Sequence, residues 1–445
     1  MSIQGDKSER PPFFKLSETP VRLTTYLRGV VSDPASVIPA DIYDQWVAPP
    51  KIPGGPLVIT RPETVRDILR DKDARFGRNK QLRTMMRRVW GKGLAAAEGD
   101  DWAQQRRAVA PAFRPDRVAK TRRAFEQATR TAIDQWPTDQ PIDADVEIGP
   151  IVAAMLAGSI LPDLDPARGR EISQDIPKFV EDMTRFGLLD LLPMPEKWLD
   201  WYRGTGRTKA EQRMRQLAAA IADKRASGPD EVADLPALLR GHGALADNIL
   251  GVVPAGFETT ARAIGWGLFL LARHPEWQER LRAEARASAD GAERPLARQV
   301  AQESLRLYPP APIMVRSAIC KTEIEGQRLK PGQVAMIAVF AMHRHRRLWD
   351  QPDMFRPERF APDSGTNLDG FLPFGSGPRL CIAAQFALTE IEVALSEIVR
   401  NRQIEAFGPE PEVSLKITTH AVNGIKLLVR PMSTSPADMI LKETQ

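Results

Sequence analysis

The chain has 445 residues, 42% of them hydrophobic, and a formal net charge of +5. This is enough apolar material for a large core, and the mild positive charge fits either a solvated surface or a local basic patch for an acidic protein partner. Nucleic-acid binding and a membrane anchor are not expected, because the sequence has no zinc-finger spacing, no basic run flanked by aromatic residues and no run of about 18 apolar residues.

The N-terminal segment, residues 1–20, is polar, contains a Pro11-Pro12 pair and is expected to be flexible. It lacks the apolar run of a secretory signal peptide. The chain has two cysteines, Cys320 and Cys381, and such a low number is typical of a reducing compartment. A cytoplasmic location is therefore expected.

The first two thirds of the chain have a mainly helical pattern. A short strand is expected at residues 57–60, after a proline-rich stretch. Apolar residues then recur at helical spacing over 124–136 and 208–227. A long apolar run over 246–273 predicts a helix that ends at a His-Pro pair.

After about residue 309 the pattern changes to short strands. They are expected at 315–319, 324–329 with a turn at Gly326, 334–340, 417–419 and 425–429. No repeat, linker or change of composition divides the chain. The expected fold is a single large domain over residues 1–445 that is mainly α with smaller β-sheets, an α+β architecture.

Cys381 lies in a loop rich in glycine and proline, directly before an apolar run with a helical pattern. A thiol held near backbone N–H groups at the start of a helix is expected to have a lowered pKa. A lone thiolate in such a position is suited to be the axial ligand of haem iron.

This loop resembles the haem-binding loop of the cytochrome P450 family, whose pattern is Phe-x-x-Gly-x-x-x-Cys-x-Gly. Phe374, Gly377 and Cys381 match it, whereas Ala383 stands in place of the final glycine. The resemblance implies haem b bound through Cys381, with Phe374 and Gly375 beside it. It also implies no flavin or iron–sulfur centre in this chain, so that a separate protein supplies the electrons.

The long apolar helix contains a polar pair, Glu258-Thr259, after the small residues Ala255 and Gly256. Such a pair is usually exposed or back-bonded, but in an apolar helix it must face a cavity or be paired. It matches the family's Ala/Gly-Gly-x-Asp/Glu-Thr motif, which implies that Thr259 and Glu258 manage protons during oxygen activation. The two small residues let a ligand approach the backbone. Pro254 is not part of the motif and is expected to kink the helix.

Glu303 and Arg306 share one helix face, which alone predicts only an ordinary ion pair. Together with Arg359, in a Pro-Glu-Arg-Phe segment, they match the Glu-x-x-Arg helix and the corresponding segment of the family. The resemblance implies a structural lock that supports the cysteine loop.

Trp102 and Arg106 lie four residues apart, on one face of an expected helix, and match the family's Trp-x-x-x-Arg helix. The resemblance implies that both bind a haem propionate, and that Arg316 and Arg379 do the same. Arginine suits this role because its donors form a fixed fork. For Arg316, a solvated side chain remains the alternative.

The resemblance places the substrate pocket over the haem face opposite Cys381. Its apolar candidates predict a hydrophobic substrate, although ordinary core packing explains each residue as well. The candidate wall residues are Met85, Met86, Trp90, Val252, Val253, Ile313, Met314 and Val422.

A basic run at residues 114–123 has five basic side chains and one acidic side chain. The resemblance places it on the cysteine side of the haem, where an acidic ferredoxin or flavodoxin, itself reduced by an NAD(P)H-dependent reductase, would dock. A monomer is expected.

Together these features predict a haem-thiolate monooxygenase that splits O2 and inserts one oxygen atom into a hydrophobic organic molecule. Two alternatives stay open: a peroxygenase that takes H2O2 or an isomerase of the same fold, and a haem sensor or carrier without turnover. The intact Glu258-Thr259 pair favours the monooxygenase, because the alternatives need no proton relay.

Overall fold

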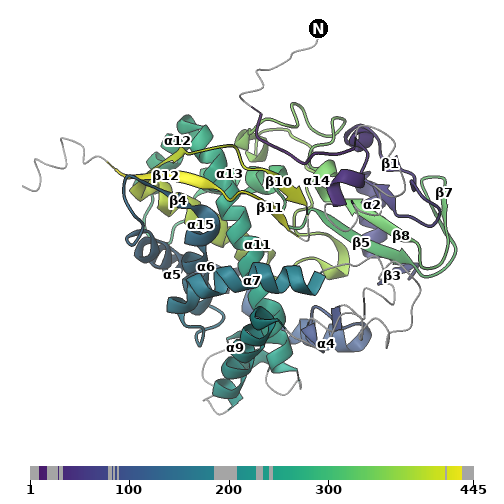
Figure 1. Ribbon diagram of the computed structural model, residues 1–445, viewed down its shortest axis with the longest axis horizontal. Coiled ribbons are helices and arrows are strands. Elements are labelled where there is room, and N and C mark those ends of the chain that lie inside the picture. Colours follow the sequence, from purple (N-terminus) through teal and green to yellow (C-terminus); the bar gives the residue numbers. More distant parts are fainter. Residues whose placement is uncertain are drawn as a thin grey trace, which may run out of the picture.

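The computed structural model describes residues 10–17, 29, 34–78, 83, 86–87, 90–184, 208–226, 234–239, 244–415 and 418–432. A long helix, α11 (Leu245–Arg273), runs through the middle of the molecule, and other helices pack around it (Figure 1). The other described helices are α2 (Pro62–Arg70), α4 (Gly99–Val109), α5 (Pro115–Ile133), α6 (Ala144–Ala157), α7 (Gly169–Thr184), α9 (Lys209–Ala226), α10 (Leu235–Leu239), α12 (Pro275–Ala287), α13 (Pro295–Leu307), α14 (Val339–Met342) and α15 (Ala384–Asn401).

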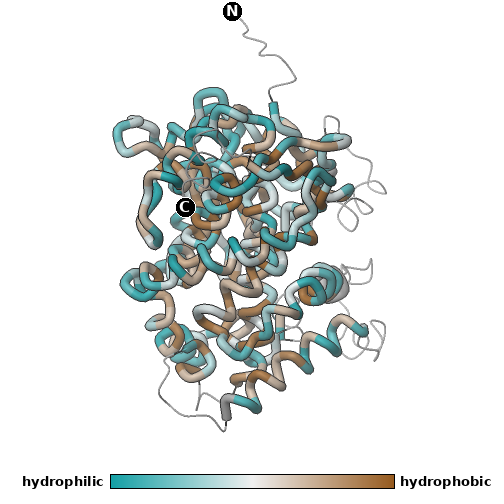
Figure 2. The backbone as a smooth tube through the Cα atoms, turned by 90° about the vertical axis from the view of Figure 1, so that its left-hand side faces the viewer, coloured by the Kyte–Doolittle hydropathy of each residue, from teal (hydrophilic) through white to brown (hydrophobic). Residues whose placement is uncertain are grey.

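The apolar composition of α11 follows from its central place. Its second half is enclosed on all sides, and Trp266, Leu268 and Leu270 are fully buried. The helix continues through Pro254, so this proline does not end it. Figure 2 shows the same organisation for the described residues, with segments of hydrophobic residues mostly inside and segments of hydrophilic residues mostly outside.

The strands of the described residues form small sheets beside the helices. The largest has the order β1-β2-β8-β5-β3 and lies on the side of α2 (Figure 1). Its strands are β1 (Val47–Ala48), β2 (Leu57–Ile59), β3 (Phe76–Gly77), β5 (Ile313–Ala318) and β8 (Val334–Ala338). Within it β2 and β8 run parallel, while β5 pairs antiparallel with β8 and brings Arg316 opposite Ala335.

The smaller sheets come mostly from the C-terminal part. One has the order β4-β12-β9, and the others are the hairpins β6-β7 and β10-β11. Their strands are β4 (Gln140–Asp143), β6 (Thr322–Ile324), β7 (Gln327–Leu329), β9 (Arg402–Ala406), β10 (Val413–Leu415), β11 (Thr419–Ala421) and β12 (Lys426–Pro431). Mainly helical structure with several small sheets confirms the predicted α+β class.

The described part of the N-terminal segment, residues 10–17, packs onto the body of the molecule. Phe14 is buried, with its ring centroid 5.0 Å from that of Phe340. The hydroxyl of Tyr308 donates to the carbonyl of Pro12 at 2.6 Å. Residues 10–17 thus have one aromatic anchor, Phe14, that the polar composition of the segment did not reveal, and the flexibility expected of residues 1–20 stays a prediction.

Among the helices of the described ranges, none is both long enough and apolar enough to cross a bilayer.

Candidate functional site

The cysteine loop is held by its own backbone and by close contact with α2. The N–H of Cys381 donates to the carbonyl of Phe374 at 3.0 Å. Gly377 has a φ of +72°, and a Cβ there would lie 2.4 Å from the carbonyl oxygen of Leu69. Only glycine fits this position, because both the backbone conformation and the space exclude a side chain.

The Cys381 thiol lies beside backbone and charged donors at the start of α15. The N–H of Ala383 and the guanidinium of Arg106 lower its pKa, but burial among protein atoms outweighs them and raises the pKa. The polypeptide alone therefore does not produce the lowered pKa that the sequence predicted. Cys381 is nevertheless accessible to solvent, although most of its surroundings are protein atoms.

Ala383 takes the place of the family's glycine without strain. Its φ is −95°, in a region that any residue adopts. The departure from the family pattern thus leaves the geometry of the loop intact.

One face of α11 is accessible although its neighbours are buried. Ala255 is exposed and Gly256 and Thr259 are half-buried, while Phe257 and Glu258 between them are buried. The hydroxyl of Thr259 donates to the carbonyl of Ala255 at 2.6 Å. Ala255 and Thr259 lie one turn apart, so they share a face that borders an open space.

Glu258 points away from this face into a polar cluster. Its Oε1 accepts from Arg262 Nε at 3.0 Å and from Thr418 Oγ1 at 3.2 Å. Arg262 Nη1 also lies 2.7 Å from Asp145 Oδ2. The direct partners of Glu258 thus come from its own helix, α11, and from the β10–β11 turn. Asp145 of α6 is connected to Glu258 only through Arg262, and the sequence pattern indicated neither Thr418 nor Asp145.

Trp102 and Arg106 on α4 lie beside Arg379 of the cysteine loop, and their predicted binding of haem propionates stays a prediction. The guanidinium of Arg379 lies 4.3 Å from the ring centroid of Trp102, and that of Arg106 lies 5.7 Å from it. Arg106 Nη2 donates to the carbonyl of Leu380 at 2.9 Å, and Arg379 Nη1 donates to that of Ala97 at 3.0 Å. α4 is thereby tied directly to the cysteine loop.

Arg316 and a fourth arginine, Arg78, complete a positive cluster. Burial, followed by repulsion from Arg78, lowers the pKa of Arg379 to about 10, and Arg316 and Arg106 repel it further. Burial also lowers the pKa of Arg316, again with repulsion from Arg78. Buried guanidinium groups repel one another in this way when they lack enough anionic partners.

The carboxylates that face this cluster are few. Glu98 lies 3.8 Å from Arg78, and Asp71 interacts with Arg316. A bound group with two carboxylates would offset the excess positive charge, so these residues fit the propionates of a haem. Arg78 was not among the residues predicted to bind it, although its place before an Arg-rich loop was visible in the sequence.

The predicted lock residues lie together in the core. Arg306 donates to the two carboxylate oxygens of Glu303 at 2.6 and 2.8 Å. Arg359 Nε lies 3.5 Å from Glu303 Oε1, at ion-pair distance without a hydrogen bond. Arg306 and Glu303 are fully buried, so the pair is one of the enclosed charge pairs of the fold.

His343 connects this lock to the cysteine loop, and no sequence motif pointed to it. Its Nε2 accepts from the backbone N–H of Leu372 at 3.0 Å, and its Nδ1 lies 3.2 Å from the carbonyl of Arg306. Burial and the charge of Arg306 lower its pKa to about 3. His343 is therefore a neutral imidazole whose Nδ1–H donates to Arg306.

Glu390 links the two central helices and was also missed. Thr260 on α11 donates to Glu390 Oε2 on α15 at 3.2 Å. Complete burial raises the pKa of Glu390 well above its usual range. A buried carboxyl with a raised pKa thus lies between the helix of the polar pair and the helix that follows Cys381.

Five of the eight predicted wall residues are partly accessible, namely Met86, Trp90, Val252, Ile313 and Met314. Trp90 packs along α11, since a Cβ on Gly251 would lie 3.6 Å from Trp90 Cδ1. Met314 Sδ would lie 3.3 Å from a Cβ on Gly375. Met85 lies outside the described residues.

Two wall candidates need correction. Val253 packs in the hydrophobic core, because it lies on the enclosed side of α11. Val422 is 60% exposed and follows β11, whereas the turn that faces Glu258 lies at the other end of this strand, at Thr418. A turn does follow β11 at Val422, as expected, but the Val422 side chain faces solvent.

The basic run at residues 114–123 forms the start of α5 and is only partly a surface patch. Arg114, Lys120 and Arg123 are exposed. Arg122 is buried and pairs with Glu392 of α15 at 2.7 Å. This side chain therefore joins α5 to α15 instead of facing solvent.

The chain matches the family model for cytochrome P450 over residues 55–424. It is 32% identical over 361 residues to a cyclooctatin synthase from Streptomyces melanosporofaciens, an alignment that covers 74% of this chain and 77% of that protein. It is 29% identical to a cyclooctat-9-en-7-ol 5-monooxygenase of the same organism, over 76% of this chain and 77% of that protein.

A plant relative matches over a longer stretch at lower identity. Cytochrome P450 714C3 from Oryza sativa subsp. japonica is 27% identical over 84% of this chain and 79% of that protein. The matched region contains the Cys381 loop, the α11 motif and the arginine cluster. The chain therefore belongs to the cytochrome P450 family and is a monooxygenase of that family.

Proposed function

We propose that the protein binds haem b through Cys381 and hydroxylates, or otherwise oxidises, a hydrophobic molecule with O2 and electrons from a separate protein. The main support is that the exposed thiol of Cys381 lies next to the arginine cluster. Arg106 donates to the carbonyl of Leu380, the residue before Cys381, and the cluster has more positive charge than its carboxylate neighbours offset. A thiol ligand and two carboxylate-binding arginines are the two features that a haem with thiolate ligation needs.

The proposed roles follow from position. When bound, the haem supplies activation of O2 and transfer of one oxygen atom. Cys381 ligates its iron, and Trp102, Arg106, Arg316 and Arg379, together with Arg78, hold its carboxylates. Ala255 and Gly256 leave room beside α11. Thr259 and Glu258 supply protons, and Glu303, Arg306 and Arg359 keep the cysteine loop in place.

The substrate class is proposed from the accessible apolar side chains and from the relatives. The name of one relative describes an unsaturated alcohol as its substrate. Met86, Trp90, Ile313 and Met314 are partly accessible apolar side chains, and they are proposed to line the substrate pocket. We therefore expect a mostly hydrocarbon substrate, and substrate screening should begin with unsaturated cyclic hydrocarbons and their alcohols.

Electron donors are proposed to dock on the exposed basic side chains of α5. α5 packs against α15, which starts directly after the cysteine loop. Lys120 is exposed on α5, and its reversal to glutamate should slow reduction by an acidic ferredoxin. Arg430→Glu, on β12, is a matched surface control. Equal reduction rates for both variants and the wild type would remove α5 as the docking site.

The function itself is tested by supplying a ferredoxin or flavodoxin, its reductase, NAD(P)H and 18O2. Substrate-dependent O2 consumption with one 18O atom in the product supports the monooxygenase. Product formation from H2O2 alone, with none from O2 and electrons, would instead support a peroxygenase. Ligand binding without any product would support a sensor or carrier.

A further inference from the structure

Trp90 differs from the other candidate wall residues because its side chain carries a strong hydrogen-bond donor, the indole Nε1–H. The Nε1 atom is almost completely inaccessible to solvent, and none of the described residues offers it an acceptor. Buried donors without a partner are rare in folded proteins, because leaving such a hydrogen bond unmade is costly. The donor therefore calls for an acceptor from a bound molecule.

The indole ring of Trp90 lies against the side of α11 that leads to the open space. Its Cδ1 atom, which is bonded to Nε1, would lie 3.6 Å from a Cβ on Gly251. Gly251 lies one helical turn before Ala255 and two turns before Thr259, the two residues that border this space. Gly251 is buried whereas Ala255 is exposed, so the indole covers α11 directly beside its accessible stretch.

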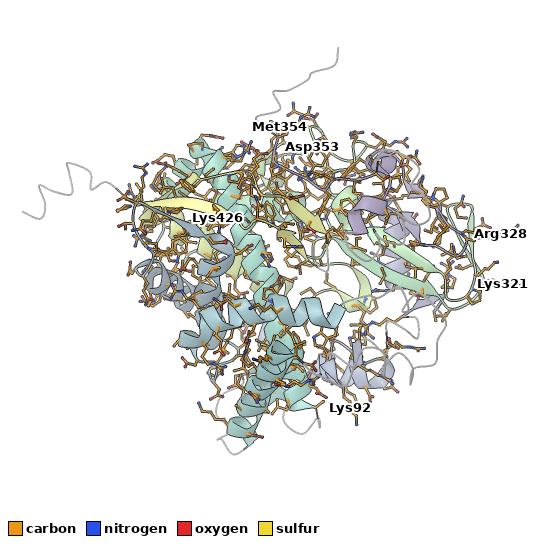
Figure 3. All side chains as sticks on the ribbon, viewed as in Figure 1. Lys92, Lys321, Arg328, Asp353, Met354 and Lys426 are labelled. Carbon is orange, nitrogen blue, oxygen red and sulfur yellow. The ribbon has the colours of Figure 1, made fainter. Side chains whose placement is uncertain are left out.

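Hydrogen bonds hold the segment that follows Trp90 against the first turns of α11. The backbone N–H of Lys92 donates to Asp247 Oδ2 at 2.9 Å, and that of Leu94 donates to Asn248 Oδ1 at 2.8 Å. The Lys92 side chain is exposed and lies at the outer edge of the molecule, beside α4 (Figure 3). The position of the indole is therefore fixed by backbone contacts that do not involve its own N–H group.

The same segment extends from α11 to the arginine cluster. Arg78 Nη1 donates to the carbonyl of Ala95 at 2.8 Å, and Arg379 Nη1 donates to the carbonyl of Ala97 at 3.0 Å. These arginines are proposed above to hold the carboxylates of the haem. Trp90 thus lies on a segment that joins the accessible face of α11 to the proposed haem site, where a substrate would bind.

We propose that Trp90 binds an oxygen atom of the substrate by donating a hydrogen bond from Nε1. The preferred substrate is then a hydrocarbon skeleton that carries an acceptor oxygen, in a hydroxyl, ether or carbonyl group. A single polar contact of this kind fixes the orientation of a ligand that is otherwise held by apolar side chains. The inference rests on the proposed function and deepens it, because it names the group by which the substrate is recognised.

Two substitutions separate the N–H group from the bulk of the indole. Trp90→Phe and Trp90→His both remove one ring, but only histidine keeps a ring N–H donor. Calorimetry of the haem-loaded protein measures the affinity for cyclooctanone and cyclododecanone, whose oxygen accepts but cannot donate, and for cyclooctane and cyclododecane. The ratio of ketone affinity to cycloalkane affinity should fall about tenfold in Trp90→Phe, because the carbonyl loses its donor. Trp90→His should recover most of this loss.

A matched control lies in the same segment. Lys92→Gln changes an exposed side chain and keeps the backbone N–H that Asp247 accepts, so it should leave the affinity ratio unchanged. A second readout needs no ligand. Since the Nε1–H group has no acceptor in the free protein, Trp90→His should have a melting temperature no higher than that of Trp90→Phe. A clearly higher value for Trp90→His would show that the protein itself supplies the acceptor, and would refute the proposal.

The binding measurements distinguish this proposal from a purely apolar role of Trp90. If Trp90→Phe weakens the binding of ketone and cycloalkane equally, or changes neither affinity, the hydrogen bond to substrate is refuted. The proposed function fails by a separate result, namely no substrate-dependent O2 consumption by the wild type. Because the affinity ratio is measured without turnover, a tenfold fall in Trp90→Phe would still support an oxygen-binding donor in that case.

Discussion

The Nε2 atom of His343 accepts a hydrogen bond from the backbone N–H of Leu372, at 3.0 Å, where the cysteine loop begins. The same imidazole lies 3.2 Å from the carbonyl of Arg306 through Nδ1. The neutral side chain of His343 therefore links the helix of the Glu303–Arg306 pair to the segment that carries Cys381.

This arrangement predicts acid sensitivity. The pKa of His343 is lowered from 6.5 to about 3 by burial and by Arg306. The contribution of His343 to the free energy of unfolding is present above pH about 6.5 and is lost as pH falls toward about 3. Between these values His343 is protonated in the unfolded chain but remains neutral in the folded chain. His343 should contribute a slope of about 1.4 kcal/mol per pH unit in this window. His343→Gln should remove that slope from urea unfolding curves measured across it, and an identical slope in the variant would contradict this role.

The arginine cluster should stabilise the haem-bound protein at the expense of the haem-free one. Arg316 is repelled by Arg78 and buried, so Arg316→Gln should raise the melting temperature of the haem-free protein. The same change should weaken haem binding about tenfold, since one charge-assisted contact is lost. Thermal unfolding and haem transfer measure the two effects. A decrease in both the melting temperature of the haem-free protein and the affinity for haem would show that Arg316 is an ordinary structural residue. Arg328→Gln, on the exposed strand β7, serves as control.

The buried lock should be costly to break. Glu303→Gln leaves Arg306 and Arg359 without their carboxylate, and removing one partner of a buried pair costs about 3–5 kcal/mol in free energy of unfolding. Glu323 pairs with Arg328 at 4.0 Å on the surface, and Glu323→Gln should cost less than about 0.5 kcal/mol. Chemical denaturation of the two variants compares these costs directly. Similar losses in the free energy of unfolding for the two variants would mean that the buried pair contributes no more to stability than the surface pair.

Substitutions at two small residues of the cysteine loop should differ clearly in their cost to stability. Gly377→Ala places a Cβ 2.4 Å from the carbonyl oxygen of Leu69 at a φ of +72°, so we expect a loss of about 2–4 kcal/mol in stability. Ala383→Gly restores the family's residue at a φ of −95°, and it should cost no more than about 1 kcal/mol. The comparison is made by thermal unfolding, and equal effects would contradict the close packing of the loop on α2.

The parts of this fold that could be predicted are those that produce a recognisable pattern within a short stretch of sequence. The long apolar run of α11 and the short, mostly apolar segments of β5 and β8 are local patterns, and all three elements lie within a few residues of the predicted bounds. The cysteine loop was recognisable because its glycines are needed at fixed positions. By contrast, β11 begins at Thr419, two residues later than expected. The turn expected near Val422 is present, but the sequence did not reveal that this side chain faces solvent.

The missed site residues depend on partners far away in the sequence. His343 meets Leu372, Glu390 meets Thr260, and Asp145 meets Arg262. None of these pairs lies within one helix turn, so no spacing rule indicates them. For Arg122 the local pattern was misleading. The five basic side chains of residues 114–123 suggested one exposed patch, but Arg122 lies on the buried face of α5 and pairs with Glu392.

The measurement that tests the central claim most directly is the carbon monoxide difference spectrum of the dithionite-reduced protein, recorded for the wild type and for Cys381→Ser. If Cys381 ligates the haem iron as a thiolate, the wild type shows a strongly red-shifted Soret band and the variant loses it. A wild-type band typical of histidine or neutral thiol ligation, or the same red-shifted band in both proteins, would contradict the assignment of Cys381.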